Sequence, residues 1–375
     1  LNIIAFGSFL ALMSKFGVGV KHHSVIEDFV NKESFISAKG MLGRVIIWSF
    51  AIELIGTLIL YFSWNDSIPF NTAGDRLFFS LFHSFSAFNN AGFSLMTDGL
   101  FNEYVRYNYL AHNVITALVF LGALGFVAIF DLFGWKNIKK RIENPWKQIS
   151  FSTKIALNFS LALVVLGTVL FYVLEANNTL ADHSFLGKIT TSLFQSVTRT
   201  SGFNTVDIGA LGIPITIVLL FLMFVGSSSS STGGGIKTST FALLWATTIS
   251  TIRSKKNIEL FKKTLSNDLV YRAFAVFVFF VVGNLICIFL LSITESEILS
   301  QPDRSILDLI FEEVSAFGTV GLSTGITSQL SPIGKIIIIA SMFIGRIGTL
   351  TVAFALGKKA ISTGYKYPQG HTMVG

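Results

Sequence analysis

Ser86-Ala-Phe-Asn-Asn90-Ala-Gly92-Phe93-Ser94 is the stretch that decides the fold, because its pattern returns twice along the chain. The copies are Ser196-Val-Thr-Arg-Thr200-Ser-Gly202-Phe203-Asn204 and Ser315-Ala-Phe-Gly-Thr319-Val-Gly321-Leu322-Ser323. The pattern Ser-x-x-x-[Asn/Thr]-x-Gly-[Phe/Leu]-[Ser/Asn] shares five columns, and its glycines lie 110 and 119 residues apart (202 − 92 and 321 − 202). Such an internal repeat predicts one structural unit per copy. A polar loop that returns between apolar stretches suits a pore that takes one backbone segment from each repeat.

The composition is that of a membrane protein. Hydrophobic residues make up 51% of the 375 residues and charged residues 13%, and the mean hydropathy is +0.66, which is too apolar for a soluble domain. We therefore expect one integral membrane domain built of repeats. The single cysteine, Cys287, lies in an apolar run, so the chain has no disulfide framework.

The net charge of +7 could indicate a nucleic-acid partner, but the positions of the charges argue against one. The Lys and Arg residues gather in alternate connections between the apolar stretches, which is the positive-inside distribution. This pattern predicts a multi-pass protein of the cell (inner) membrane, surrounded by lipid. The basic loops should be cytoplasmic and the glycine loops should face outside.

The apolar stretches divide into long and short segments. A span needs roughly 20 apolar residues, and the segments before each glycine motif are too short to cross. The candidate spans are Ile46–Phe62, Tyr109–Phe130, Lys154–Leu174, Tyr271–Ile293 and Gly334–Leu356, with the interrupted stretch Ile213–Trp245. The candidate re-entrant helices are Arg76–Phe88, Ser184–Thr198 and Arg304–Phe317. Non-helical backbone at membrane depth is tolerated where it lines a water-filled path or is buried in protein, which favours a pore.

Each repeat should therefore consist of an outer helix, a half-helix, a filter loop and an inner helix (M1-P-M2), in an all-α fold around one central pore. Counting back one period from Gly92 places another such glycine at about −20, before the first residue. Leu1–Met13 is then expected to be the inner helix of a truncated first repeat. The expected divisions are 1–45 (the end of the first repeat), 46–153 (second repeat), 154–270 (third repeat) and 271–375 (fourth repeat and tail).

The glycine loops have the properties of a cation filter. Rings of backbone carbonyls replace the water around a dehydrated cation, and glycine permits the positive φ that turns successive carbonyls toward an axis. The half-helices end at the loops, and the partial negative charge of a helix C-terminus favours a cation there. Close helix packing by small residues would explain one glycine but not five matched columns. The predicted filter positions, which would hold K⁺ by backbone carbonyls, are Asn90, Ala91, Gly92, Phe93, Thr200, Ser201, Gly202, Phe203, Thr319, Val320, Gly321 and Leu322.

A second segment, from Gly226 to Thr238, interrupts the third inner helix with serine and glycine. So many poor helix formers must break the helix in mid-membrane, and such a break in the conduction path is more typical of a gate than of a passive kink. The segment does not fit the phosphate-binding pattern G-x-x-x-x-G-K-[ST], and no strand precedes it. The predicted gate residues are Ser227, Ser228, Ser229, Ser230, Ser231, Thr232, Gly233, Gly234, Gly235, Lys237 and Arg346.

Arg346 places a charge in the middle of the last span. A buried arginine is costly unless it is paired or reaches water. Two interpretations stay open: a structural hydrogen bond to a neighbouring helix, or a latch in which the guanidinium holds carbonyls of residues 226–235. Glu53, on an outer span, is more typical of a satisfied structural acid. The histidines show no metal-ligand spacing.

At these residues the chain resembles the Trk/Ktr/HKT superfamily of potassium transporters, and within it the KtrB-type pore subunits. The resemblance runs over essentially the whole chain. It is carried by Phe88–Phe93, Thr198–Asn204, Ala316–Leu322, Ser231–Lys237, Gly345-Arg346 and the tail from Tyr367-Pro368 to Val374-Gly375.

The resemblance implies four M1-P-M2 repeats around one pore, potassium uptake that is often stimulated by sodium, and a homodimer. It also implies a cytoplasmic ring of nucleotide-binding RCK subunits that opens the gate, and no cofactor beyond the transported ion. Two departures matter. Ser229-Ser230 stands where the family commonly has Pro-Gly, and the first filter motif, which often separates potassium from sodium members, is not in the sequence.

Three alternatives stay open. The first is a member that conducts sodium or co-transports sodium and potassium. The second is an intramembrane enzyme with Glu53 or His112 as a base, although no nucleophile and base stand together in a motif. The third is a regulatory membrane scaffold, which would not need repeated filters.

Overall fold

The computed structural model describes residues 38–65, 68–144, 146, 149–302 and 304–347. It is predominantly helical with almost no sheet, as expected for an all-α membrane protein. Among these residues, three helices are long and apolar enough to cross a membrane, Gly43–Ser63, Phe151–Glu175 and Asn267–Thr294, and the bent pair Tyr109–Leu124 and Phe126–Phe133 makes a fourth if it is counted as one span. The expected helix Leu1–Met13 and the C-terminal tail lie outside the described residues.

The described chain repeats one order of elements three times: a long helix, a half-helix, a loop and an inner helix. The second repeat has α3 (Ala38–Ser63), α4 (Ala73–Phe88) and α5 (Tyr109–Leu124). The third has α8 (Phe151–Glu175), α9 (Phe185–Thr198) and α10 (Ile213–Phe224). The fourth has α12 (Asn267–Thr294), α14 (Ile306–Phe317) and α15 (Pro332–Ile347).

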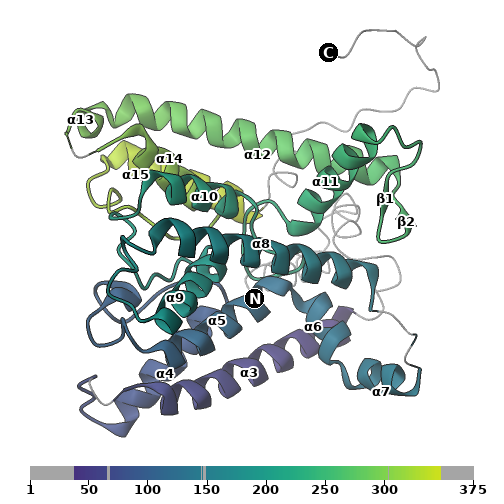
Figure 1. Ribbon diagram of the computed structural model, residues 1–375, viewed down its shortest axis with the longest axis horizontal. Coiled ribbons are helices and arrows are strands. Elements are labelled where there is room, and N and C mark those ends of the chain that lie inside the picture. Colours follow the sequence, from purple (N-terminus) through teal and green to yellow (C-terminus); the bar gives the residue numbers. More distant parts are fainter. Residues whose placement is uncertain (1–37, 66–67, 145, 147–148, 303, 348–375) are drawn as a thin grey trace, which may run out of the picture.

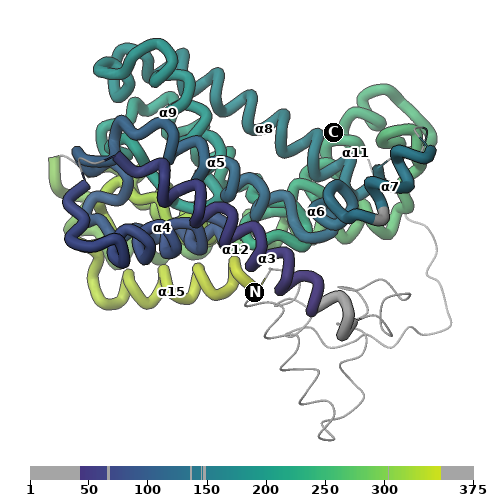
Figure 2. Tube along the Cα trace, turned by 90° about the horizontal axis from the view of Figure 1, so that it is seen from below, coloured from purple at the N-terminus to yellow at the C-terminus, as the bar shows by residue number. Residues whose placement is uncertain are grey.

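Short elements connect these helices. They are η3 (Gly99–Phe101), α6 (Phe126–Phe133), α7 (Trp135–Glu143), α11 (Thr238–Ile252) and α13 (Ser296–Leu299), with an antiparallel hairpin of β1 (Glu259–Leu260) and β2 (Lys263–Thr264). The long helices α3, α8 and α12 run across the molecule in Figure 1 with other helices between them, and α7 and the hairpin lie at one end of the molecule and α13 at the other. Figure 2 shows the same division from below, with α6 and α7 together at one end.

Each half-helix begins at a hydroxyl cap. The Thr72 hydroxyl accepts a hydrogen bond from the Asp75 N–H, and the Asp75 carboxylate accepts one from the Thr72 N–H. Ser305 and Asp308 form the same capping box at α14, and the Ser184 hydroxyl caps α9. These contacts satisfy N–H groups that have no partner within the helix, so the start of each half-helix is fixed locally.

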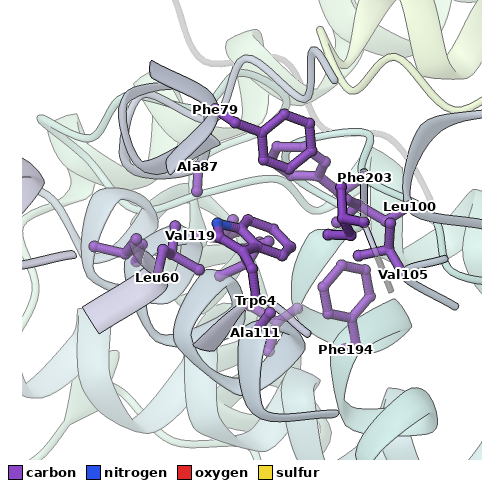
Figure 3. Packing of buried hydrophobic residues seen from close by; sticks show 14 of the residues in the cluster. Leu60, Trp64, Phe79, Ala87, Leu100, Val105, Ala111, Val119, Phe194 and Phe203 are labelled. Carbon is purple, nitrogen blue, oxygen red and sulfur yellow. The ribbon is translucent and has the colours of Figure 1, made fainter. Parts of the chain in front are cut away.

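The largest apolar core joins the second and third repeats. Trp64, Phe79, Phe194 and Phe203 are all buried in it, and the labelled side chains converge between the helices in Figure 3. The Trp64 indole N–H donates to the Ser80 hydroxyl at 2.9 Å, so its polar atom is satisfied. Because Phe203 follows Gly202, this core anchors one glycine loop directly.

Two inner helices are broken. The interruption expected within Ile213–Trp245 is confirmed, because α10 ends at Phe224 and α11 begins at Thr238. The candidate span Tyr109–Phe130 is also interrupted, because α5 and α6 meet at Gly125 with a bend of 105°. Gly125 has φ +87°, and the Phe126 N–H donates to the Ser230 carbonyl at 3.0 Å rather than to its own helix.

Candidate functional site

The glycine loops leave the half-helices in a common way. The loop N–H groups bond back to the last turn of each half-helix, as with Ala91 to the Ser86 carbonyl at 2.9 Å and Val320 to the Ser315 carbonyl at 2.8 Å. Gly92, Gly202 and Gly321 have φ of +72°, +86° and +98°, a region that glycine enters without strain. The loop N–H groups are thus turned toward the helix.

The three loops meet at their glycines. A Cβ atom on Gly92 would lie 1.8 Å from the Ser201 carbonyl oxygen, and one on Gly202 would lie 2.4 Å from the Val320 oxygen. On Gly321 the nearest atom would be the Gly202 Cα at 3.8 Å. The Gly202 loop therefore lies against both the Gly92 loop and the Gly321 loop, and the contacts leave no room for a side chain at Gly92 or Gly202.

A wide cavity of about 890 Å³ lies against two of these loops and reaches Gly202 and Gly321. Its wall carries the carboxylates of Asp98, Glu103 and Asp207 and one cation, Arg106. Arg106 is paired with Asp182 at 3.7 Å. Acidic walls raise the local concentration of cations, so the cavity has the charge of a cation vestibule.

The side chains at the [Asn/Thr] position of the motif connect the glycine loops to the predicted gate segment, which runs from Gly226 to Lys237. The Thr200 hydroxyl donates to the Asn90 Oδ1 at 2.8 Å, and the Asn90 amide donates to the Thr232 hydroxyl at 2.8 Å. Thr232 in turn donates to the Phe88 carbonyl at 3.0 Å. The sequence predicts only backbone roles for this column, and the structure adds a buried chain of side-chain hydrogen bonds from one glycine loop through another to the predicted gate segment.

Polar residues on two half-helices form hydrogen bonds with the last serine of the motif, Ser94 or Ser323. His83 Nε2 and the Ser94 hydroxyl lie 3.0 Å apart, and the Ser323 hydroxyl donates to Glu312 at 2.7 Å. His83 and Glu312 each lie three residues before the motif serine, on the buried side of α4 and α14. Sequence reasoning missed both, although a buried polar residue at the same offset in two repeats was a usable signal.

The residue after each glycine differs in its surroundings. Phe203 and Leu322 are buried, whereas Phe93 is 69% exposed. The three loops therefore share their backbone turn but not their packing.

The gate segment from Gly226 to Lys237 fits into the corner between α5 and α6. The N–H groups of Ser228 and Thr232 donate to the carbonyls of Ala123 and Gly122 at 2.9 and 3.2 Å. These carbonyls lie in the last turn of α5, where the helix supplies no donor. The backbone of the segment after α10 therefore caps the C-terminal end of α5.

The gate segment is also closed on itself. The Ser227 and Ser231 hydroxyls lie 2.6 Å apart, and the Lys237 ammonium donates to the Gly233 carbonyl at 2.6 Å. The segment is buried except near its tip, where Ser229 and Ser230 are exposed. The predicted gate residues thus form one compact loop rather than an extended linker.

Arg346 does not make the contact expected of a latch. Its guanidinium donates to the Thr319 hydroxyl at 3.4 Å, and within the part of the chain that the structure describes it donates to no carbonyl of residues 226–235. Of the two open interpretations, the structure shows, among the residues it describes, a hydrogen bond to a neighbouring loop and none of the bonds expected of the latch. Arg346 lies on α15 beside the fourth-repeat loop.

Arg199 makes the type of contact that was expected of Arg346. It is 3% exposed, and its Nη1 donates to the carbonyls of Leu222 and Val225 at the broken end of α10. The helix ends there, so these carbonyls lack helical donors. Sequence reasoning missed Arg199 because it lies inside the second glycine motif, at a position that the repeats do not share.

The two residues considered as a catalytic base, Glu53 and His112, are both buried. Glu53 is buried and accepts a hydrogen bond from Asn89 at 2.7 Å, as expected of a satisfied acid. His112 is buried with its ring against Phe194. Over the described ranges, no group of three or more His, Cys, Asp or Glu could hold a metal ion.

Comparison with known proteins agrees with this architecture. Residues 3–363 match the family model of TrkH, a cation transport protein. The chain is 35% identical to Ktr system potassium uptake protein B of Bacillus subtilis, over 100% of this chain and 80% of that protein. It is 34% identical to the protein of the same name from Vibrio alginolyticus, over 97% and 77%. The crystal structure of the potassium transporter TrkH from Vibrio parahaemolyticus shares the fold, with a TM-score of 0.70 and 17% identity over 89% of this chain and 68% of that one.

The fold is thus the M1-P-M2 repeat fold, in a multi-pass membrane protein similar to Ktr-type transporters rather than to enzymes. The chain belongs to the TrkH family of cation transport proteins.

Proposed function

We propose that this chain takes up potassium ions through a filter made of the backbone carbonyls around Gly92, Gly202 and Gly321. The observation that carries the proposal is the meeting of the three loops, with Gly92 against the Ser201 carbonyl and Gly202 against the Val320 carbonyl. The names of the relatives, potassium uptake proteins of Ktr systems, point to the same ion.

The proposed path begins in the acidic cavity. The carboxylates of Asp98, Glu103 and Asp207 concentrate cations there. The carbonyls of the loops then replace the water around the ion, and the C-terminal ends of α4, α9 and α14 add partial negative charge. The ion is the cargo, and no cofactor is needed for the step.

The gate in this proposal is the segment from Gly226 to Lys237. Closure is supported by its hydrogen bonds to Gly122 and Ala123 and by the Arg199 clamp on the end of α10. Lys237 and Arg346 add positive charge beside the loops, which opposes a cation that leaves the filter. Opening requires the segment to release the carbonyls of α5.

The assembly and orientation are also proposals. The relatives are named as parts of a Ktr system, which supports a partner subunit. We propose a homodimer with a cytoplasmic RCK ring, with the basic end of the molecule in the cytoplasm and the glycine loops facing outside. The repeat boundaries at 46, 154 and 271 belong to the same proposal.

A sodium-coupled variant is the second candidate. The chain is 33% identical to potassium/sodium uptake protein NtpJ of Enterococcus hirae over 94% of its length. Selectivity measurements, rather than uptake alone, separate the two.

The test is rubidium uptake into proteoliposomes by the full-length protein, with sodium as a competitor. Gly202→Ala should weaken the discrimination against sodium, because its Cβ would lie 2.4 Å from the Val320 oxygen. Gly43→Ala is the matched control, because a Cβ on Gly43 meets nothing within 4 Å. Unchanged affinity and selectivity in Gly202→Ala, at normal membrane insertion, would contradict the filter.

A further inference from the structure

The helix α7 carries an apolar face that is exposed in the part of the chain that the structure describes. Trp135, Ile138 and Ile142 follow the spacing i, i+3, i+7 and so share one face of the helix. Trp135 is 79% exposed and Ile142 is 75% exposed. A tryptophan and an isoleucine exposed to this extent on one short helix indicate a binding surface for a membrane or for another molecule.

Basic side chains flank this face. Lys139 and Lys140 are exposed, and Arg141 follows them. The one acidic residue of the helix, Glu143, lies 3.9 Å from Lys139, with both side chains more than half exposed. A pair of this kind is worth little, so the helix keeps its positive character.

The position of α7 is fixed by contacts to its neighbours. Arg141 donates to the carbonyls of Asp131 and Leu132 at the end of α6, and the Asn137 amide donates to the Phe130 carbonyl at 3.2 Å. The Asp131 carboxylate accepts the Ser150 N–H at 2.7 Å, just before α8. Because Arg141 is committed to these carbonyls, the helix holds Trp135 and Ile142 in a fixed direction.

The helix lies between two candidate membrane spans along the chain. α7 connects α6 to the start of α8 and occupies the same end of the molecule as the β1–β2 hairpin before α12 (Figure 1). An amphipathic helix with tryptophan and isoleucine on one face and lysines beside it is typical of the membrane–water interface. We propose that α7 lies in this interface and binds anionic phospholipid headgroups through Lys139 and Lys140, with Trp135 and Ile142 among the acyl chains.

Charge complementarity favours an anionic lipid surface over a protein partner. The apolar face continues from exposed Phe133 at the end of α6, and α6 belongs to a candidate membrane span. A lipid surface can bind both the apolar face, through its acyl chains, and the lysines, through its headgroups, and needs no complementary protein surface. Binding of a soluble protein subunit to α7 would contradict this proposal.

The test is quenching of Trp135 emission by brominated lipids in vesicles of phosphatidylcholine and phosphatidylglycerol. The full-length protein is reconstituted with bromine on one lipid at a time, and Trp135→Phe supplies the background of the other tryptophans. We expect both lipids to quench Trp135, and brominated phosphatidylglycerol to quench it more strongly.

The lysine variants separate charge from insertion. Lys139→Gln and Lys140→Gln should each reduce the preference for phosphatidylglycerol about fivefold, since a basic residue near an anionic surface is worth about 1 kcal/mol. Lys256→Gln, at an exposed basic position before β1, should leave that preference unchanged. Ile142→Ser should weaken quenching by both lipids equally, which gives a second measure if the charge variants fold poorly.

Three results would overturn the proposal. They are no quenching of Trp135 by either lipid, equal quenching by both lipids, and Trp135 emission that changes only when a soluble partner protein is added. None of these measurements depends on ion flux, so failure here would leave the proposed filter unaffected.

Discussion

Two inner helices break at membrane depth, and they break differently. α5 turns into α6 at the single residue Gly125, with a bend of 105°, whereas the loop from Val225 to Lys237 separates α10 from α11. The two breaks complete each other, because the loop donates N–H groups to the carbonyls of Gly122 and Ala123 and accepts the Phe126 N–H at Ser230. The broken helix of the third repeat thus supplies hydrogen bonds that the broken helix of the second repeat lacks.

The comparison explains why only one break is visible in the sequence. The third-repeat loop has a composition that no helix tolerates. The second-repeat break is a single glycine in an apolar run, and its partners lie more than 100 residues away at Ser228, Ser230 and Thr232. A break that depends on tertiary partners leaves no local signal.

The largest effect on ion uptake should come from deleting most of the loop between α10 and α11. Deleting Ser227–Thr232 removes the segment that closes α5, so basal rubidium uptake should rise by more than an order of magnitude and depend less on a regulatory subunit. Closed and open states that differ by a few kcal/mol allow such a shift. Uptake at the wild-type level in this deletion would reduce the loop to a packing element.

The two arginines should differ in the same assay. Arg199→Gln removes a charged donor from two carbonyls, which costs about 2–4 kcal/mol of closed-state stability, and basal uptake should rise tenfold or more. Arg346→Gln loses one hydrogen bond of 3.4 Å to the Thr319 hydroxyl and should change uptake only severalfold.

Arg199→Lys is the matched control for this pair. It keeps the charge but loses the planar donor group, so an intermediate effect is expected. If Arg346→Gln raised uptake more than Arg199→Gln, the assignment of the clamp to Arg199 would be wrong.

The bend itself can be tested at Gly125. Gly125→Ala places a Cβ 2.4 Å from the Ser229 carbonyl oxygen at φ +87°, which costs about 1–3 kcal/mol. The gate segment should loosen and uptake should rise about tenfold, whereas Gly43→Ala should leave it unchanged. Wild-type uptake and wild-type thermal stability in Gly125→Ala would show that the two breaks do not depend on each other.

The smallest effect is expected at the tip of the loop. Ser230 has φ +59°, so Ser230→Gly should relieve strain and stabilise the closed loop by about 1 kcal/mol, which lowers basal uptake severalfold. Ser229→Gly should do the opposite, since the Ser229 hydroxyl is paired with Ser239 at 2.6 Å. Equal effects of both variants would show that backbone strain at Ser230 is not what matters.

Much of the fold could be predicted because it is encoded locally. Membrane-length apolar runs predict α3, α8 and α12, and the glycine motif at the end of a short amphipathic segment predicts a half-helix in each repeat. Helix bounds followed the expectation closely where a cap lies nearby, as at Ser184 before α9.

The site could be predicted less completely, because its side-chain contacts join distant repeats. The glycine column is visible as a repeat, but the chain from Thr200 through Asn90 to Thr232 spans residues more than 100 positions apart. Arg199 is buried and Arg346 is partly buried, and only the structure shows that Arg199 reaches the end of α10 while Arg346 reaches Thr319. Composition predicts that a buried arginine has a partner but not which one.

The central claim is that cations bind where the three glycine loops meet. The most direct measurement is an anomalous difference map from crystals of the full-length protein in rubidium. The account predicts peaks enclosed by the backbone of Gly92, Gly202 and Gly321, which weaken in Gly202→Ala crystals and persist in Gly43→Ala crystals. Ordered rubidium elsewhere in the membrane-spanning region, with none between these glycines, would contradict the account.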